Sequence, residues 1–175
     1  MRKWLIALST VCILGAVNFA IWKNEQLIEH GETVLLELAP VDPRSLMQGD
    51  YMALRFAMAD AIRAELDSQT DRLSGHAIVQ LDAQRRASFV ALDQQQALAD
   101  GQVRLQFRLR NGQIKFATNA FFFQEGTGSI YEEAQYGLFR VGSEGQLMLT
   151  HLVDAQLQTL GQSKPLQQQK TLTQP

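Results

Sequence analysis

The stretch VRLQFRLRNGQIKFATNAFFF, residues 103–123, places alternating apolar and polar residues on both sides of an Asn-Gly pair. In a strand, one face would carry the apolar residues Val103, Leu105, Phe107 and Leu109 and the other the polar residues Arg104, Gln106, Arg108 and Arg110. Asn-Gly between two such runs is a strong hairpin signal. The stretch therefore predicts strands at 101–110 and 113–123 in an antiparallel sheet with one solvent-exposed face.

Similar patterns on either side predict the remaining elements of this domain. Further strands are expected at 33–38, 51–57, 76–84, 86–93, 136–142 and 146–157, with a second hairpin at 142–145. Met58, Ile62 and Leu66 lie four residues apart and predict a short amphipathic helix over 58–68. Ser129 and Glu132 match a capping box and predict helix within 126–135. The fold class is α+β, mostly antiparallel sheet with one or two short helices.

The N-terminal part of the chain is strongly apolar. Residues 4–22 form a run of nineteen uncharged residues, which as a helix would extend about 28 Å, close to the thickness of a bilayer core. Trp4 and Trp22 stand at the two ends of this run, and Arg2 and Lys3 precede it, as expected of a cytoplasmic end. The run predicts a single transmembrane helix that contacts the lipid bilayer, with the N-terminus in the cytoplasm of a bacterium and the bulk of the chain in the periplasm.

Two other interpretations of this segment are less consistent with its residues. A cleaved signal peptide would need a small-x-small site, but Leu14, Asn18 and Phe19 interrupt the candidates around Ala16 and Ala20. A lipoprotein cysteine is not indicated at Cys12, because Val11 stands where a small residue is expected. We therefore expect an uncleaved anchor.

These patterns divide the chain into an anchor at 1–23, a polar connector at 24–31, an exported domain at 32–160 and a disordered Gln-rich tail at 161–175. Cys12, the one cysteine, lies in the anchor, so the exported part has no disulfide. Of the 16 Lys and Arg and 18 Asp and Glu residues, three basic residues and no acidic ones lie in the anchor. The remainder has 13 basic against 18 acidic residues, and this excess of acid argues against nucleic acid as a partner.

The segment PVDPRSLMQGD, residues 40–50, is the main candidate for a functional loop. Its Asp42-Pro43 and Gly49-Asp50 steps are ordinary turn chemistry, so a purely structural role explains them. Alternatively, SLMQGDYM loosely resembles the membrane-anchored signal peptidases, with Ser45 as nucleophile and Lys115 as its base. Such a dyad needs a buried, deprotonated lysine. The spacing from Ser45 to Gly49 is shorter than in that family.

Other chemical signatures are missing from the sequence. His30, His76 and His151 lie in separate segments without partners at metal-ligand spacing. No phosphate-binding loop is present, since GTGS lacks the lysine of that motif. We therefore predict no catalytic, cofactor-binding or metal-binding residues. The FFF run at 121–123 is expected to pack mainly in the core, with at least one ring on the opposite face near Tyr131 and Tyr136 as a contact surface.

Three segments resemble a known family. GDYMALRF, residues 49–56, is similar to the signature of the GDYXXLXY family of bacterial membrane-anchored proteins, with Phe56 in place of the last Tyr. LELAPVDPRSLMQGDY, residues 36–51, resembles the usual lead-in to that signature. FFFQEGTGSIYEEAQYGLFRV, residues 121–141, is similar to the second block of the family.

The resemblance implies an accessory role rather than a defined activity, because members are often encoded beside or fused to multi-span membrane proteins. It marks motif residues with structural or interaction roles: Asp42, Pro43, Arg44, Gly49, Asp50, Tyr51, Leu54, Phe56, Glu125, Gly126, Tyr131, Glu132 and Arg140. Phe56 keeps the aromatic ring and loses the hydroxyl, so a packing role at this position remains intact.

We hypothesise that the two blocks meet in space, with Arg44 bridging Glu125 or Glu132 and holding the 40–50 loop, because charged groups beside apolar strands are costly unless paired. The predicted function is a membrane-anchored periplasmic accessory or binding subunit of a multi-span envelope protein. The alternative is a periplasmic enzyme or small-ligand-binding domain that uses residues 42–51.

Overall fold

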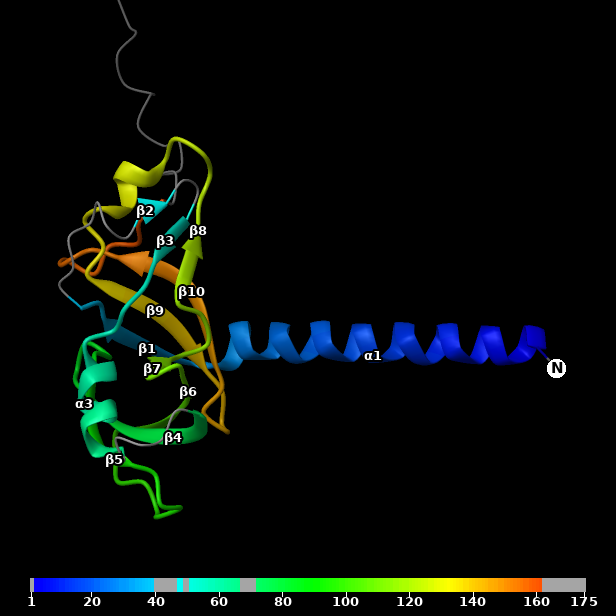
Figure 1. The fold of residues 1–175 in the computed structure, drawn as a ribbon, viewed down its shortest axis with the longest axis horizontal. Helices are drawn as coiled ribbons and strands as arrows, with labels where there is room; N and C mark the ends of the chain where they lie inside the picture. The colour runs from blue at the N-terminus through cyan, green and yellow to red at the C-terminus, as the bar shows by residue number, and fades with distance from the viewer. Residues whose placement is uncertain (1, 40–46, 49–50, 67–71, 162–175) are drawn as a thin grey trace, which may run out of the picture.

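The computed structural model describes residues 2–39, 47–48, 51–66 and 72–161 of the chain. A long N-terminal helix, α1 (Arg2–His30), leads into a β domain and projects away from it (Figure 1). The other elements are β1 (Glu32–Glu37), β2 (Met47–Gln48), β3 (Tyr51–Ala53), α3 (Met58–Glu65), β4 (Arg72–Leu81), β5 (Ala87–Leu92), β6 (Gln102–Arg110), β7 (Gln113–Lys115), β8 (Ala120–Phe122), the 3₁₀ helix η1 (Gly128–Tyr131), β9 (Tyr136–Val141) and β10 (Leu147–Val153). The α+β class and the antiparallel sheets are confirmed.

Helix α1 is continuous through residues 24–30, which the sequence analysis assigned to a connector, and ends at His30. Its large apolar side chains are exposed, including Trp4 at 81% and Phe19 at 64%. The predicted transmembrane helix is not confirmed: within the described ranges, no helix has both the length and the apolar character that crossing a bilayer requires.

The largest sheet has four strands in the order β5-β4-β6-β7, all paired antiparallel. Its β6–β7 hairpin turns at Asn111 and Gly112, which have φ values of 52° and 72°. Positive φ at both central residues is the geometry for which Asn-Gly is selected, because it matches the twist of the flanking strands. The hairpin predicted from the sequence is therefore confirmed.

A second sheet has the strand order β1-β9-β10 and is also antiparallel. The predicted hairpin at 142–145 joins β9 to β10, where the Gly142 N–H donates to the Gln146 carbonyl over 2.9 Å. This sheet meets the four-stranded one where the Leu35 N–H donates to the Arg85 carbonyl over 2.9 Å. The two larger sheets are thus connected through β1.

The single strand predicted over 113–123 is wrong, because the chain forms β7 and β8 with residues 116–119 between them. Phe116 turns into the core, and the Thr118 hydroxyl accepts from the Ala120 N–H at 3.1 Å and donates to the Ala120 carbonyl at 2.8 Å. This local turn carries the chain out of the four-stranded sheet and into a small third sheet of order β2-β3-β8.

Other expectations also differ from the structure, and of the strand predicted at 51–57 only Tyr51–Ala53 forms β3. Residues 126–135 contain only the short η1, where Ser129 lies inside the 3₁₀ turn and no side chain caps its start, so the capping box is not confirmed. Strand β10 ends at Val153 rather than continuing to residue 157. There the Asp154 carboxylate accepts from the N–H groups of Gln156 and Gln158, at 2.9 and 2.8 Å, and closes a turn.

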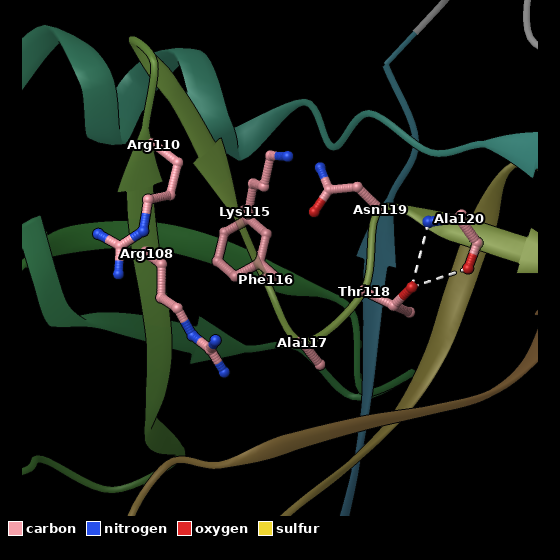
Figure 2. Close-up of a pocket in the computed structure, with 8 residues that line it drawn as sticks. All are labelled: Arg108, Arg110, Lys115, Phe116, Ala117, Thr118, Asn119 and Ala120. Carbon is pink, nitrogen blue, oxygen red and sulfur yellow. Dashed lines mark hydrogen bonds between the residues drawn. The ribbon is translucent and has the colours of Figure 1, made fainter. Parts of the chain in front are cut away.

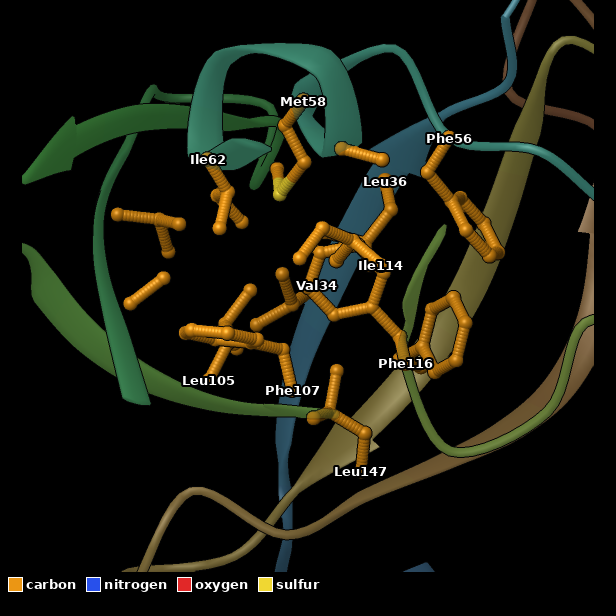
Figure 3. Packing of buried hydrophobic residues seen from close by; sticks show 14 of the residues in the cluster. Val34, Leu36, Phe56, Met58, Ile62, Leu105, Phe107, Ile114, Phe116 and Leu147 are labelled. Carbon is orange, nitrogen blue, oxygen red and sulfur yellow. The ribbon is translucent and has the colours of Figure 1, made fainter. Parts of the chain in front are cut away.

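Buried apolar side chains from the two larger sheets and from α3 form one core (Figure 3). Helix α3 contributes Met58, Ala59 and Ile62 from one face, which confirms the predicted amphipathic helix. Gly75 in β4 lies opposite Phe107 in β6, and a Cβ at this glycine would stand 3.2 Å from the ring. In the described part of the chain, no charged residue is buried, so the core is held by apolar burial.

Candidate functional site

The described part of the signature, residues 51–56, connects separate parts of the β domain. Strand β3 pairs with β8, and the Leu54 N–H then donates to the Asn119 carbonyl over 2.7 Å. Beyond this point the Arg55 carbonyl accepts from the Ala39 N–H over 2.8 Å, which attaches the segment to the end of β1. Leu54 itself is buried in the core. The signature therefore links the small sheet to the β1-β9-β10 sheet.

Phe56, where the signature has its last Tyr, lies at the centre of the core with 0% of its surface exposed. Its ring packs edge-on against Phe116, with centroids 5.6 Å apart, and against Phe139, with centroids 5.5 Å apart. Gly137 in β9 makes room for this cluster, because a Cβ there would approach the Phe139 ring to 2.9 Å and the Phe56 ring to 3.3 Å. Position 56 thus has a packing role, in agreement with the sequence analysis.

The second block places an aromatic cluster beside the small sheet. Tyr131 lies between Phe121 and Phe123, with ring centroids 5.1 and 5.3 Å away. Phe122 points to the other side, where its ring lies 5.8 Å from that of Tyr51 and is 74% exposed. One of the three phenylalanines is left on the opposite face, as expected, but it lies beside Tyr51 and not near Tyr131 and Tyr136.

The acidic residues of the second block face solvent. Glu125 and Glu132 are exposed, and Gly126 has φ +80° in the turn before η1. This turn is held by the Thr127 hydroxyl, which donates to the Gln124 carbonyl over 2.6 Å.

Arg140 lies at the opposite end of β9 from the aromatic cluster. Its Nη1 donates to the Gly31 carbonyl at 3.1 Å and to the Thr33 hydroxyl at 2.7 Å. Gly31 follows directly after the last residue of α1. The guanidinium therefore ties the C-terminal end of α1 to the sheet, where a cation also complements the helix dipole.

Five of the motif residues, Asp42, Pro43, Arg44, Gly49 and Asp50, lie outside the residues that the structure describes, as does Ser45. The contact between Arg44 and Glu125 or Glu132 therefore stays a prediction. Lys115 is exposed on β7, whereas a Ser/Lys dyad requires a buried lysine.

A basic groove lies beside the β6–β7 hairpin and was not identified in the sequence analysis. It has a volume of about 380 Å³ and is lined by Arg108, Arg110, Lys115, Phe116, Ala117, Thr118, Asn119 and Ala120 (Figure 2). A neighbouring recess of about 490 Å³ shares Lys115 and Asn119 with it and extends to Arg55, Asp60 and Arg63 near α3. Alternation of Arg108 and Arg110 along β6 predicted a solvent-exposed face. The β6–β7 register places Lys115 opposite Arg108, whereas the approach of Asn119 depends on the chain leaving the sheet after β7.

A smaller recess of about 190 Å³ contains Asp82, Arg86 and Tyr136. The Asp82 carboxylate accepts from the N–H groups of Gln84 and Arg86 and from Nε of Arg86, at 2.9, 2.9 and 2.7 Å. The hydrogen bonds from Arg86, from its backbone first and then its side chain, lower the pKa of Asp82 from its ordinary value of 3.8. Hydrogen bonds to Asp82 and then to Tyr136 raise the pKa of Arg86. This arrangement stabilises the turn between β4 and β5.

Replacement of Asp82 by Asn should therefore lower stability in a pH-dependent way. The folded pKa of Asp82 lies below 3.8, so its stabilisation is fully present above this pH and is lost as the pH falls through the folded value. Urea unfolding of the full chain over a pH series should show the wild type more stable than D82N at neutral pH and the two converging in acid. A constant difference at every pH would show that the charge of Asp82 contributes nothing.

Metal-ligating residues do not come together in the described ranges, where no group of three or more His, Cys, Asp or Glu side chains is found. His30 ends α1, His76 lies in β4 and His151 lies in β10. The histidines thus stay in separate elements.

Comparison with curated proteins gave no match, and neither did comparison with solved structures. The sequence model described as "GDYXXLXY protein" matches residues 13–152. The match includes the described signature segment at 51–56, the aromatic block at 121–131 and Arg140, whose contacts are given above. The chain belongs to the GDYXXLXY family.

Proposed function

We propose that the protein is a membrane-anchored accessory or binding subunit that associates with a multi-span protein of the bacterial envelope. Helix α1 would hold it in the inner membrane, with the N-terminus in the cytoplasm and the β domain in the periplasm. The aromatic face formed by Tyr51 and Phe122 would contact the partner.

The observation that carries this proposal is the exposure of α1. The helix projects from the β domain (Figure 1), and the described side chains of residues 4–22 are all exposed. Exposed apolar surface on this scale needs lipid or protein around it. Among the described residues, no helix qualifies as membrane-spanning. The uncharged run at 4–22 also contains residues 5–8, whose side chains are not among those that the structure describes.

The join between α1 and the β domain also supports an anchored subunit. Only Gly31 separates His30, at the end of α1, from Glu32, at the start of β1, and Arg140 hydrogen-bonds both Gly31 and Thr33. A short, hydrogen-bonded connection of this kind would hold the β domain close to the membrane surface. It would therefore limit which part of a membrane partner the domain can reach.

Co-purification tests the proposal. Full-length tagged protein, extracted in a mild neutral detergent, should bring down a multi-span protein. Replacement of Phe122 by Asp should remove that partner, because a charge would be buried in the contact. Val90→Asp is the matched control, since Val90 is also an exposed apolar residue on a strand, at the far edge of the four-stranded sheet.

Exchange of α1 for an unrelated membrane helix separates the two contacts. If α1 takes part in recognition, the exchange should weaken recovery of the partner while Val90→Asp leaves it unchanged. Failure of the wild type to bring down a multi-span protein would contradict the proposed association, and equal recovery by the wild type, Phe122→Asp and the α1 exchange would contradict the proposed contacts.

A further inference from the structure

The basic groove gathers cations that have no acidic partner. Elsewhere in the described chain, Arg55, Arg85, Arg86 and Arg104 form ion pairs with Asp60, Glu32, Asp82 and Asp93, respectively. Arg108, Arg110 and Lys115 form no ion pair with any described residue, and all three are exposed. These unpaired cations lie in a domain whose overall charge is negative.

The backbone brings these like charges together. Arg108 and Lys115 are directly opposite in the β6–β7 register, and Arg110 follows two residues along the same face of β6. Like charges at directly opposite positions destabilise a sheet. Figure 2 shows the Arg108 and Arg110 side chains extending from the same side of β6, beside Lys115. A bound anion would turn this repulsion into attraction.

The groove also contains an acceptor without a donor. The Asn119 Oδ1 atom is buried and has no hydrogen-bond partner among the described residues, while the Nδ2 atom of the same amide donates to the Leu54 carbonyl at 3.3 Å. Asn119 lines both the basic groove and the neighbouring recess. A buried acceptor of this kind is costly unless a ligand supplies an N–H or O–H group.

We propose that the basic groove binds an extended acidic peptide segment of a partner protein, which extends the proposed subunit function by naming a docking site and its chemistry. Alternate residues of an extended peptide lie about 7 Å apart, which is also the spacing of Arg108 and Arg110 along β6. Carboxylates at alternate positions would pair with the two guanidinium groups. Asn119 Oδ1 is inaccessible to solvent in the free groove, so a peptide N–H would donate to it only after the Asn119 side chain moves.

Other anions fit these features less well. A fully ionised phosphate group brings charge but neither an N–H nor an O–H donor for Asn119. Single-stranded nucleic acid needs exposed rings for base stacking, whereas Phe116, the aromatic residue of the groove, is buried. The adjoining recess borders α3, which lies on the side of the β domain away from α1 (Figure 1). An anionic bilayer reached by α1 would therefore lie on the side opposite this recess.

Peptide binding to the full-length chain in neutral detergent tests the inference. Fluorescence anisotropy should show that a labelled hexapeptide of Glu-Ser repeats binds to the chain and that the corresponding Gln-Ser hexapeptide does not. The double variant R108Q/K115Q should weaken binding about 10-fold. Added salt should also weaken binding of the peptide to the wild type, because it screens the ion pairs.

The matched control is Arg85→Gln, which removes one exposed positive charge away from the groove. The single variant K115Q, which removes one positive charge within the groove, should weaken peptide binding more than R85Q does. Unchanged thermal unfolding of R108Q/K115Q confirms that the variant is folded. Equal binding of the peptide to wild type and R108Q/K115Q would overturn the proposal, as would tighter binding of pyrophosphate or anionic vesicles than of the peptide. This assay contains no envelope partner, so its failure is distinguishable from a failure of co-purification.

Discussion

Replacement of Phe56 by Ala should lower the free energy of unfolding by about 3–5 kcal/mol, as expected when a large aromatic ring is removed from a tightly packed core. Phe56 is fully buried and contacts the rings of Phe116 and Phe139 from two sides. Its loss would leave a cavity where the signature segment, residues 116–119 and β9 meet. Urea unfolding of the full chain in neutral detergent, followed by circular dichroism, measures the effect.

Phe122→Ala is the matched control for this experiment. The Phe122 ring is 74% exposed and lies on the outer side of β8, so its removal should change the unfolding free energy by less than about 0.5 kcal/mol. If the two variants lose similar stability, Phe56 does not occupy the centre of the core as described.

Replacement of Leu14 by Asp should release the full chain from membranes. Leu14 lies near the middle of the uncharged run at 4–22, and its side chain is 56% exposed. A carboxylate near the centre of a membrane helix costs roughly 2.5–3.5 kcal/mol, which corresponds to a change of about 100-fold in partitioning. Quantitative blotting of membrane and soluble fractions after cell lysis measures the shift.

Leu98→Asp serves as the control for added charge. Leu98 is an exposed apolar residue between β5 and β6, so its replacement should leave the distribution between fractions as in the wild type. Membrane recovery of Leu14→Asp equal to that of Leu98→Asp would mean that the apolar run of α1 does not retain the chain.

The sequence predicted the strands with strict alternation well, because alternation directly reports which face of a strand is buried. The β6–β7 hairpin is the best case, since Asn111 and Gly112 require the positive φ that the structure shows. The break between β7 and β8 was missed, although the alternation stops there, since Phe116 and Ala117 are both apolar and Thr118 and Asn119 are both polar. Only the burial of Phe116 and the contact of Asn119 with Leu54 explain why the chain leaves the sheet there.

Only part of the candidate site could be predicted, because some of its contacts join residues that are far apart in the sequence. The family resemblance singled out Tyr51, Leu54 and Phe56, and the structure places these residues where the sheets connect. It grouped Arg140 with the acidic residues of the second block, whereas the structure places Arg140 against Gly31 and Thr33. That contact spans more than a hundred residues, and no local pattern reports it. The basic groove was missed because its cations come together only through strand register.

The most direct measurement is the recovery of the full-length chain, with its N-terminus verified by mass spectrometry, after membranes are washed with alkaline carbonate. Anchoring through α1 predicts that the intact chain stays in the membrane pellet and that a chain lacking residues 1–23 does not. Recovery of the intact chain in the wash supernatant would contradict a membrane-anchored subunit.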